Sequence, residues 1–191
     1  MIDRAVLRAQ PVLQGHGLWL EQLGPEHLGG YERLLTDPEG LRLTATPLEF
    51  EADSAYRWLA SRPGQDDRAD YAILRAEDGV FLGEAVLNEL DEESARANFR
   101  IGLAGQEVYG RGYGTEATRL ILDYAFGQVG LHRVELEVYA FNPRAQRSYE
   151  KCGFVREGVR RQALRWEGTW NDVIVMGILT TDPRPWTVAL R

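Results

Sequence analysis

Three glycines stand at alternate positions, 110, 112 and 114, directly before the most regular helical pattern in the chain. Residues 98–103, ahead of the glycines, predict a strand, so the loop joins a strand to a helix. Glycine lets the backbone approach a ligand closely, and the free N–H groups at the start of a helix attract an anion. The loop is therefore a candidate pyrophosphate site; its alternative interpretation is an ordinary strand-to-helix turn. The helix that follows, over residues 115–128, is predicted from apolar residues that share one face: Ala117, Leu120, Ile121, Tyr124 and Ala125.

Two well-known phosphate-binding loops do not match this segment. A dinucleotide-binding fingerprint would need a third glycine at position 115, where Thr115 stands, and a P-loop would need Gly-Lys-Ser or Gly-Lys-Thr. The loop also follows several strands that look antiparallel, whereas both of those motifs belong to strand–helix–strand units. These differences argue against sites for a nicotinamide cofactor or a nucleoside triphosphate.

The chain has 191 residues, 44% of them hydrophobic and 27% charged, which is typical of one globular domain. We expect an N-terminal extension over residues 1–14, the domain over residues 15–181 and a tail over residues 182–191. No apolar run approaches the roughly 20 residues that span a bilayer. No secretory signal is recognised either, so we expect a cytoplasmic protein without a membrane partner.

Charge and residue usage exclude several kinds of site. The formal net charge of −7 argues against a general nucleic-acid-binding protein, and we expect no direct nucleic-acid partner. Cys152 is the single cysteine, so an intrachain disulfide is impossible. Together with three scattered histidines it forms no cluster with the spacing of a zinc site, and we expect no metal.

The remaining periodicity predicts the helices and strands of a single α/β or α+β domain. Residues 36–50, which contain two prolines and a glycine, are predicted to be a loop. Asn142 is predicted to cap a helix that starts at Pro143 and ends at Gly153. Further helices are expected over residues 26–35 and 51–61. Strands are expected over residues 15–23, 71–75, 80–90, 98–103, 133–139, 154–166 and 172–179.

Five segments resemble the GNAT family of acyl-CoA-dependent N-acetyltransferases, and within it the RimJ/RimL-type branch that acetylates ribosomal-protein N-termini. They are Gly-Arg-Gly-Tyr-Gly-Thr-Glu-Ala at 110–117, Gly-Leu-His-Arg-Val-Glu-Leu at 130–136, Asn-Pro-Arg-Ala at 142–145, Tyr-Glu-Lys-Cys-Gly-Phe at 149–154 and Trp-Asn-Asp-Val-Ile-Val-Met at 170–176. They follow the family's order and spacing, and the resemblance covers nearly the whole chain.

The resemblance implies an α+β fold with a mixed, mostly antiparallel sheet flanked by helices, a binding site for acetyl-CoA and a homodimer. In the family fold the pantetheine arm lies in a V-shaped gap between two parallel strands, here residues 98–104 and 133–139. Tyr109 stands where the family usually has Gln or Arg, which removes one polar contact with the coenzyme. The residues expected to bind the coenzyme are Leu103, Val108, Gly110, Arg111, Gly112, Tyr113, Gly114, Thr115, Asn142 and Arg147.

Acetyl transfer to an amine needs a neutral amine, a stabilised oxyanion and a proton for the departing thiolate. Tyr149 matches the family's general acid, and its alternative role is packing in the core. Many relatives carry a glutamate on the strand before the loop, but residues 98–103 contain no carboxylate. Glu84, Glu89 and Asp172 are the candidates for the base elsewhere in the chain, and Glu89 and Asp172 are the predicted catalytic carboxylates. Each has the alternative role of a solvated or structural charge.

We therefore expect an acetyl-CoA-dependent N-acetyltransferase, with backbone amides near residues 101–104 holding the oxyanion. The preferred acceptor is the N-terminal α-amine of a protein or peptide. An α-amine has an ordinary pKa of about 7.7–8.0, so part of it is neutral at pH 7 even without a base. The alternatives are an acetyltransferase for a polyamine, amino acid or aminoglycoside, and a non-catalytic protein that binds acyl-CoA.

Overall fold

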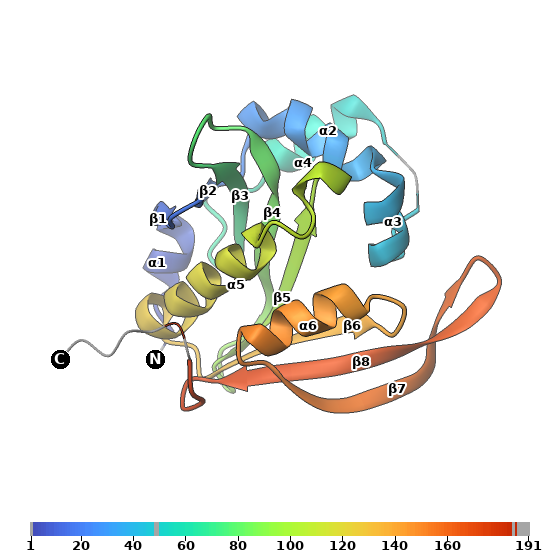
Figure 1. Ribbon diagram of the computed structural model, residues 1–191. Helices are drawn as coiled ribbons and strands as arrows, with labels where there is room; N and C mark the ends of the chain where they lie inside the picture. The colour runs from blue at the N-terminus through green and yellow to red at the C-terminus, as the bar shows by residue number, and fades with distance from the viewer. Residues whose placement is uncertain (1, 48–49, 185, 187–191) are drawn as a thin grey trace.

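The computed structural model describes residues 2–47, 50–184 and 186, and its centre is one eight-stranded sheet (Figure 1). The strand order is β1-β2-β3-β4-β5-β6-β8-β7. Neighbouring strands are antiparallel except β5 and β6, which are parallel. This is the mixed, mostly antiparallel sheet that the sequence predicted. The strands are β1 (Leu13–Gln14), β2 (Leu18–Gln22), β3 (Ala69–Arg75), β4 (Phe81–Asp91), β5 (Arg96–Leu103), β6 (Arg133–Tyr139), β7 (Val155–Trp166) and β8 (Thr169–Leu179).

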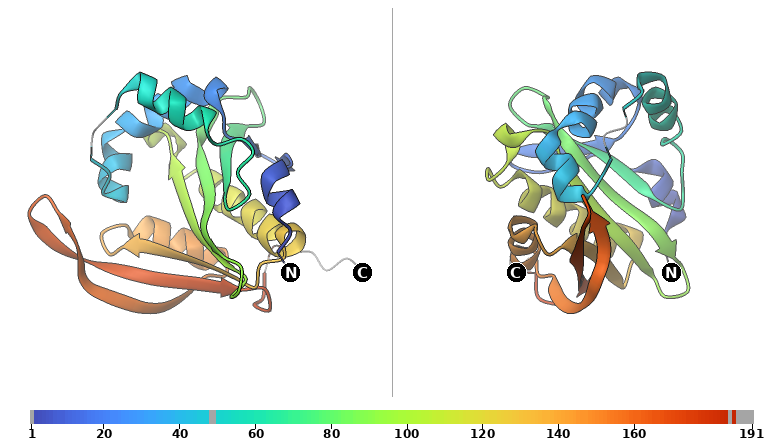
Figure 2. Two further views of the ribbon diagram at one scale, coloured as in Figure 1. Left: turned by 180° about the vertical axis from the view of Figure 1, so that it is seen from behind. Right: turned by 90° about the vertical axis from the view of Figure 1, so that its right-hand side faces the viewer.

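Helices cover both faces of the sheet (Figures 1 and 2). Apolar residues of α1, α5 and α6 belong to the larger of two buried clusters, and those of α2 and α4 belong to the smaller one on the opposite face. The helices are α1 (Arg4–Ala9), α2 (Leu28–Thr36), α3 (Pro38–Thr44), α4 (Ala52–Ala60), α5 (Tyr113–Tyr124) and α6 (Pro143–Lys151). Shorter turns are η1 (Pro25–His27), η2 (Gln106–Val108) and the π-helical η3 (Ala125–Val129), which extends α5.

The parallel strands β5 and β6 are paired over only three residues each. The register joins Arg96 to Arg133 and continues to Asn98, which faces Glu135, and no pair follows among the described residues. Beyond that point the strands separate, while β6 stays paired with β8 along its whole length. The edge of β5 facing the gap is left without a strand partner over residues 99–103. Helices α5 and α6 border this V-shaped opening (Figure 1).

The predicted loop over residues 36–50 is wrong in its first half, because residues 38–44 form α3. The carboxylate of Asp37 accepts a hydrogen bond from the N–H of Gly40 at 2.8 Å, and Pro38 occupies the first helical position. Asp-Pro is a helix start as well as a turn signal, and a helix of seven residues is too short to show a clear period. Residues 48–49 lie outside the described part of the chain.

Residues near both ends of the chain, outside the predicted domain 15–181, pack against the rest of the fold. Residues 4–9 form α1, whose Leu7 is buried in the larger core cluster, and β1 adds to the edge of the sheet. Of the predicted tail 182–191, residues 185 and 187–191 lie outside the described residues. The indole N–H of Trp186 donates to Asp123 on α5 at 3.2 Å. Among the helices of the described residues, none is both long and apolar enough to cross a membrane.

Candidate active site

The glycine loop lies between the end of β5 and the start of α5, at the open end of the V-shaped gap. Gly110 and Gly112 have φ angles of 74° and 89°, in the left-handed region that disfavours residues with a side chain. A Cβ at either glycine would meet nothing within 4 Å, so the loop backbone borders open space. Gly112 is the N-cap of α5 and has no side chain that could accept a hydrogen bond from the first N–H groups of the helix. The first N–H groups of α5 are therefore available to an anion.

Arginines surround the outer side of this loop. A cavity of about 330 Å³ there is lined by Val108, Arg111 and Tyr113 of the loop region, together with Arg33 and Arg75. Arg111 itself is exposed, whereas Val108 is buried and anchors the loop. Arg75 is already paired with Asp78. Glu107 also lines the cavity, so its charged residues are three arginines and one glutamate.

Helix α6 faces the loop from the other side of the gap. The hydroxyls of Thr115 and Ser148 form a hydrogen bond at 2.8 Å, which joins the first turn of α5 to α6. The side-chain oxygen of Asn142 accepts a hydrogen bond from the N–H of Ala145 at 3.1 Å, so the predicted cap is confirmed. Arg147 is exposed on the same helix. A role of these residues in coenzyme binding stays a prediction.

Tyr109 connects the two sides of the gap with α3. Its hydroxyl donates to Asp37 at 2.7 Å, the same carboxylate that caps α3, and its second acceptor is the carbonyl of Leu103 at 3.4 Å. The guanidinium of Arg144, in the first turn of α6, lies 4.1 Å from the centre of the Tyr109 ring. The residue that departs from the family pattern thus bridges the open end of the V-shaped gap.

Tyr149 lies where β5 and β6 separate. Its ring packs edge-on against Phe99 at 6.4 Å between centroids, and Phe99 directly follows the last paired residue, Asn98. Phe154 covers another side at 5.8 Å, and Tyr149 is 9% exposed. Burial raises the pKa of the Tyr149 phenol, so it carries its proton throughout the physiological range. Both expected roles, proton donation as the general acid and packing in the core, are compatible with this position.

Glu89 and Asp172, the two carboxylates predicted to act as the base, have no hydrogen bond to Tyr149 in the described residues. Glu89 is exposed and has a φ of 53° at an irregularity of β4, opposite the beginning of β5, whereas the glycine loop follows the end of β5. Asp172 accepts a hydrogen bond from the N–H of Gln162 at 2.8 Å and thereby supports a bulge of the β7–β8 hairpin. The assignment of these two carboxylates as the base stays a prediction.

Glu84 was the third carboxylate candidate, and its surroundings differ from those of the other two. Its Oε2 atom is buried and has no hydrogen-bond partner within the described residues. Burial is the main reason that the pKa of Glu84 rises to about 7; Arg100 lowers it, Asp70 raises it and Arg68 lowers it. A sequence pattern shows that position 84 is in a strand, but the burial comes from helices packed over that strand.

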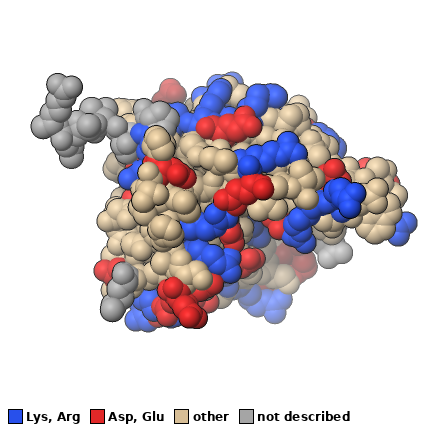
Figure 3. Space-filling view, turned by 90° about the horizontal axis from the view of Figure 1, so that it is seen from below, with Lys and Arg blue, Asp and Glu red and all other residues tan. Residues whose placement is uncertain are grey.

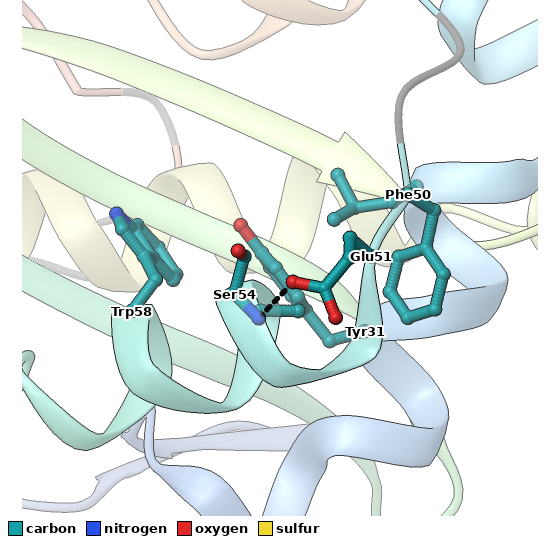
Figure 4. A pocket seen from close by; sticks show the side chains of 7 residues that line it. Tyr31, Phe50, Glu51, Ser54 and Trp58 are labelled. Atoms are coloured by element: carbon teal, nitrogen blue, oxygen red, sulfur yellow. Dashed lines mark hydrogen bonds between the residues drawn. The ribbon is translucent and has the colours of Figure 1, made fainter.

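Aromatic residues line a pocket between α2 and α4, on the same face of the sheet as Glu84 (Figure 4). Its volume is about 550 Å³. The rings of Tyr31 and Trp58 are stacked at 5.2 Å, and the electrostatic effect of Glu84 contributes to the raised pKa of Tyr31 after burial. Glu51 caps α4 by accepting from Ser54 at 2.7 Å (Figure 4). The pocket lining consists of Tyr31, Leu35, Phe50, Glu51, Ser54, Ala55 and Trp58.

The described residues contain no group of three or more His, Cys, Asp and Glu side chains that could hold a metal ion. Cys152 is buried, and its thiol contacts the carbonyl of Thr115 at 3.5 Å. Burial raises the pKa of this thiol to about 11, so it is protonated at neutral pH. This environment is typical of a packed cysteine and not of a nucleophile.

The fold, the glycine loop and the separated strands together define an acetyltransferase domain of the GNAT type. Residues 17–155 match the family described as acetyltransferase (GNAT) domain, and the chain belongs to this family. The motifs at 110–117 and 142–154 had predicted this membership. Members of the family transfer an acetyl group from acetyl-CoA.

Two N-acetyltransferases of Bacillus subtilis are similar to part of this chain. The probable N-acetyltransferase YjcK of Bacillus subtilis is 33% identical over 118 residues, which are 62% of this chain and 65% of YjcK. YdaF of the same organism, provisionally named a ribosomal N-acetyltransferase, is 30% identical over 102 residues, which are 53% of this chain and 55% of YdaF. The matched part of this chain therefore spans less than two thirds of these relatives.

A solved structure is similar over a longer part of the chain. Spermidine N-acetyltransferase from Vibrio cholerae, in complex with CoA and spermine, has a TM-score of 0.79 and 25% identity. The superposition covers 86% of this chain and 96% of that protein. Its ligands show that a protein of this fold holds both CoA and a polyamine.

Proposed function

We propose that this protein transfers the acetyl group of acetyl-CoA to a primary amine. The observation that carries the proposal is the open glycine loop at the N-terminus of α5, next to the point where β5 and β6 have separated. A pyrophosphate fits the exposed N–H groups, and the unpaired edge of β5 offers hydrogen bonds to the amide groups of a pantetheine arm. The arginines beside the loop add favourable charge for the phosphates.

The chemical roles follow from the same geometry. Tyr149 is protonated and lies against Phe99 where the strands separate, which supports a role as the acid that protonates the leaving thiolate. Within residues 101–104, the N–H of Ala104 donates to the carbonyl of Leu82 on β4 at 2.8 Å, and successive N–H groups of a strand point to opposite edges. The N–H groups of Ile101 and Leu103 therefore face the gap, where they would stabilise the oxyanion of the thioester carbonyl. Tyr149 remains the proposed acid on this basis.

The preferred acceptor in this proposal is the α-amine of a protein or peptide, as in the RimJ/RimL-type branch. Its support is the similarity to YdaF and the low ordinary pKa of α-amines. The pocket between α2 and α4 supports it further, because its walls are aromatic and its one carboxylate, Glu51, is engaged in capping a helix. The apolar side chain of a peptide's first residue would fit such walls better than a polyamine, which carries several positive charges.

A polyamine is the second candidate acceptor, and the similarity to the spermidine acetyltransferase of Vibrio cholerae favours it. A screen separates the two: wild-type protein and acetyl-CoA are incubated with peptides that differ in their first residue and with spermidine, and products are identified by mass spectrometry. The proposal predicts acetylated peptide α-amines. Acetylation of spermidine alone would favour the second candidate, and coenzyme binding without any acetylated product would favour the non-catalytic alternative.

Assembly and location also belong to this proposal. A homodimer and a cytoplasmic location are expected from the family resemblance and the sequence, respectively. Light scattering of the purified protein measures the molecular mass in solution. A mass near twice 21.6 kDa would support the dimer, and a mass near 21.6 kDa would contradict it.

A further inference from the structure

Glu84 is half-buried on β4, and its side chain combines a charge with an unused hydrogen-bonding atom. Its Oε2 is buried without a partner among the described residues, and no ion pair is formed by this carboxylate within them. Burying an acidic group without a partner lowers the stability of the folded protein, so buried carboxylates usually have a hydrogen-bond or ion-pair partner. A buried carboxylate near a pocket is therefore a candidate for a functional group that meets its partner only when a substrate is bound.

The position of Glu84 in the sheet places it beside the proposed reaction centre. On β4 it lies directly across from Gly102 of β5, within the stretch 101–104 whose N–H groups are proposed to hold the thioester oxygen. Gly102 has no side chain to separate the carboxylate from that stretch. A Cβ at Gly102 would come within 3.2 Å of Leu34 on α2, so this helix packs directly over Gly102.

The pocket between α2 and α4 provides an approach to the same side of the sheet. Tyr31 lines the pocket, and Glu84 and Arg100 both act electrostatically on its hydroxyl. An amine that enters along Tyr31 would thus reach the face of β4 and β5 that carries Glu84. Helices α5 and α6, which hold the glycine loop and Tyr149, lie on the opposite face. Acceptor and coenzyme therefore have separate entrances.

We propose that Glu84 is the base that removes the proton from the ammonium group of the acceptor. The inference rests on the proposed acetyltransferase function and adds the residue that activates the amine. The carboxylate takes one proton from the ammonium, and the neutral nitrogen forms a bond with the thioester carbon. The C–S bond then breaks, and the thiolate takes a proton from Tyr149. The attacking nitrogen loses a second proton, which restores Tyr149, while Glu84 releases its proton to solvent.

Several charged groups face Glu84 and determine where it titrates. Tyr31 approaches from α2, Arg100 from β5, Asp70 from β3 and Arg68 from the segment before β3. Burial, Arg100, Asp70 and Arg68 together place the pKa of Glu84 at about 7. A base with this pKa is ionised in part at neutral pH and is strong enough to accept a proton. The acceptor kcat/KM is expected to rise with pH through about 7, because the ionised form is the active one.

The test compares Glu84→Gln with Glu93→Gln, an exposed glutamate in the turn between β4 and β5 that has no part in the site. Release of CoA thiol is measured from pH 5.5 to 9 with a peptide that has a free α-amine and, separately, with spermidine. Glu84→Gln is expected to lose about 100-fold or more in kcat/KM for the acceptor and to lose the rise near pH 7. The affinity for CoA, measured by calorimetry, should remain within about 3-fold of wild type.

Each outcome decides the proposal. A rise near pH 7 that persists in Glu84→Gln overturns it, as does the disappearance of that rise in Glu89→Gln or Asp172→Asn with Glu84→Gln unchanged. Partial recovery in Glu84→Asp supports a role of the carboxylate itself. A wild-type protein that releases no thiol with either acceptor overturns the proposed acetyltransferase function, and the role of Glu84 with it.

Discussion

At the scale of single residues, Glu84 and Tyr149 have the same physical origin for their unusual properties. Both are ionisable groups that the core removes from water, and burial is the largest cause of the raised pKa of each. The consequences differ because the groups differ. A carboxyl group titrating near 7 exchanges protons at neutral pH, whereas a buried phenol keeps its proton until a basic group, such as the departing thiolate, forms beside it.

The burial of Glu84 predicts a pH-dependent stability. The pKa is about 7 in the folded protein and about 4.3 in the unfolded chain, so the folded state binds more protons between these values. The free energy of unfolding should therefore fall as pH rises through this window. Glu84→Gln should be more stable than wild type at pH 8 by up to about 4 kcal/mol, and nearly equal at pH 4. Urea unfolding at both pH values measures the difference; parallel pH dependence of the two proteins would contradict it.

Tyr149→Phe tests the proposed acid. The phenylalanine keeps the packing against Phe99 and Phe154 and removes the proton donor. We expect kcat to fall by about 10²- to 10⁴-fold with little change in the affinity for CoA. Tyr56→Phe, at an exposed position of α4, is the matched control. An unchanged kcat in Tyr149→Phe would show that this tyrosine only packs in the core.

Motifs predicted some site residues and could not predict others. Tyr149 and Asn142 stand at fixed distances from a recognisable helix cap, so their places on α6 follow from the sequence. The choice among Glu84, Glu89 and Asp172 depended on which of them the tertiary structure buries. Glu89 falls at an irregularity where the side-chain alternation of β4 is interrupted, and the bond between Asp172 and Gln162 spans a hairpin. Neither property is visible in local periodicity.

At the scale of elements, the loop and α5 act as one unit. Gly110 and Gly112 allow the chain to turn in the left-handed region, and α5 then begins with free N–H groups. The strand-to-helix connection was predictable because the glycines lie between a segment with the residue pattern of a strand and one with the apolar spacing of a helix. Helix α3 was not, because its start depends on Asp37, whose carboxylate is held by Gly40 and by Tyr109 from a distant part of the chain.

Gly110→Ala tests this account of the loop. The added methyl group meets open space, so the cost arises from the backbone, whose φ of 74° is unfavourable for alanine by about 1 kcal/mol. We expect the loop to shift and CoA to bind about 5- to 10-fold more weakly, as measured by calorimetry. Gly127→Ala is the control, since that glycine also borders open space but has no positive φ. Equal CoA affinity in both variants would show that the loop geometry does not set coenzyme binding.

At the scale of the whole molecule, charges of both signs are interspersed and not separated into large fields. The face seen from below carries basic and acidic side chains next to one another (Figure 3). Strand β6 contributes to this pattern through the pairs of Glu135 with Arg96 and Glu137 with Arg160. The net charge of −7 is thus an average, and the arginines near the glycine loop provide a local positive environment for an anionic coenzyme.

The central claim is that this fold brings acetyl-CoA and an amine together from opposite faces of the sheet and joins them. The most direct test is the release of CoA thiol by wild-type protein, measured with acetyl-CoA alone and with added peptide or spermidine. The account predicts thiol release that depends on the amine, with one acetylated amine formed for each thiol. Tight binding of CoA, with no thiol released above the rate without protein for any amine, would contradict it.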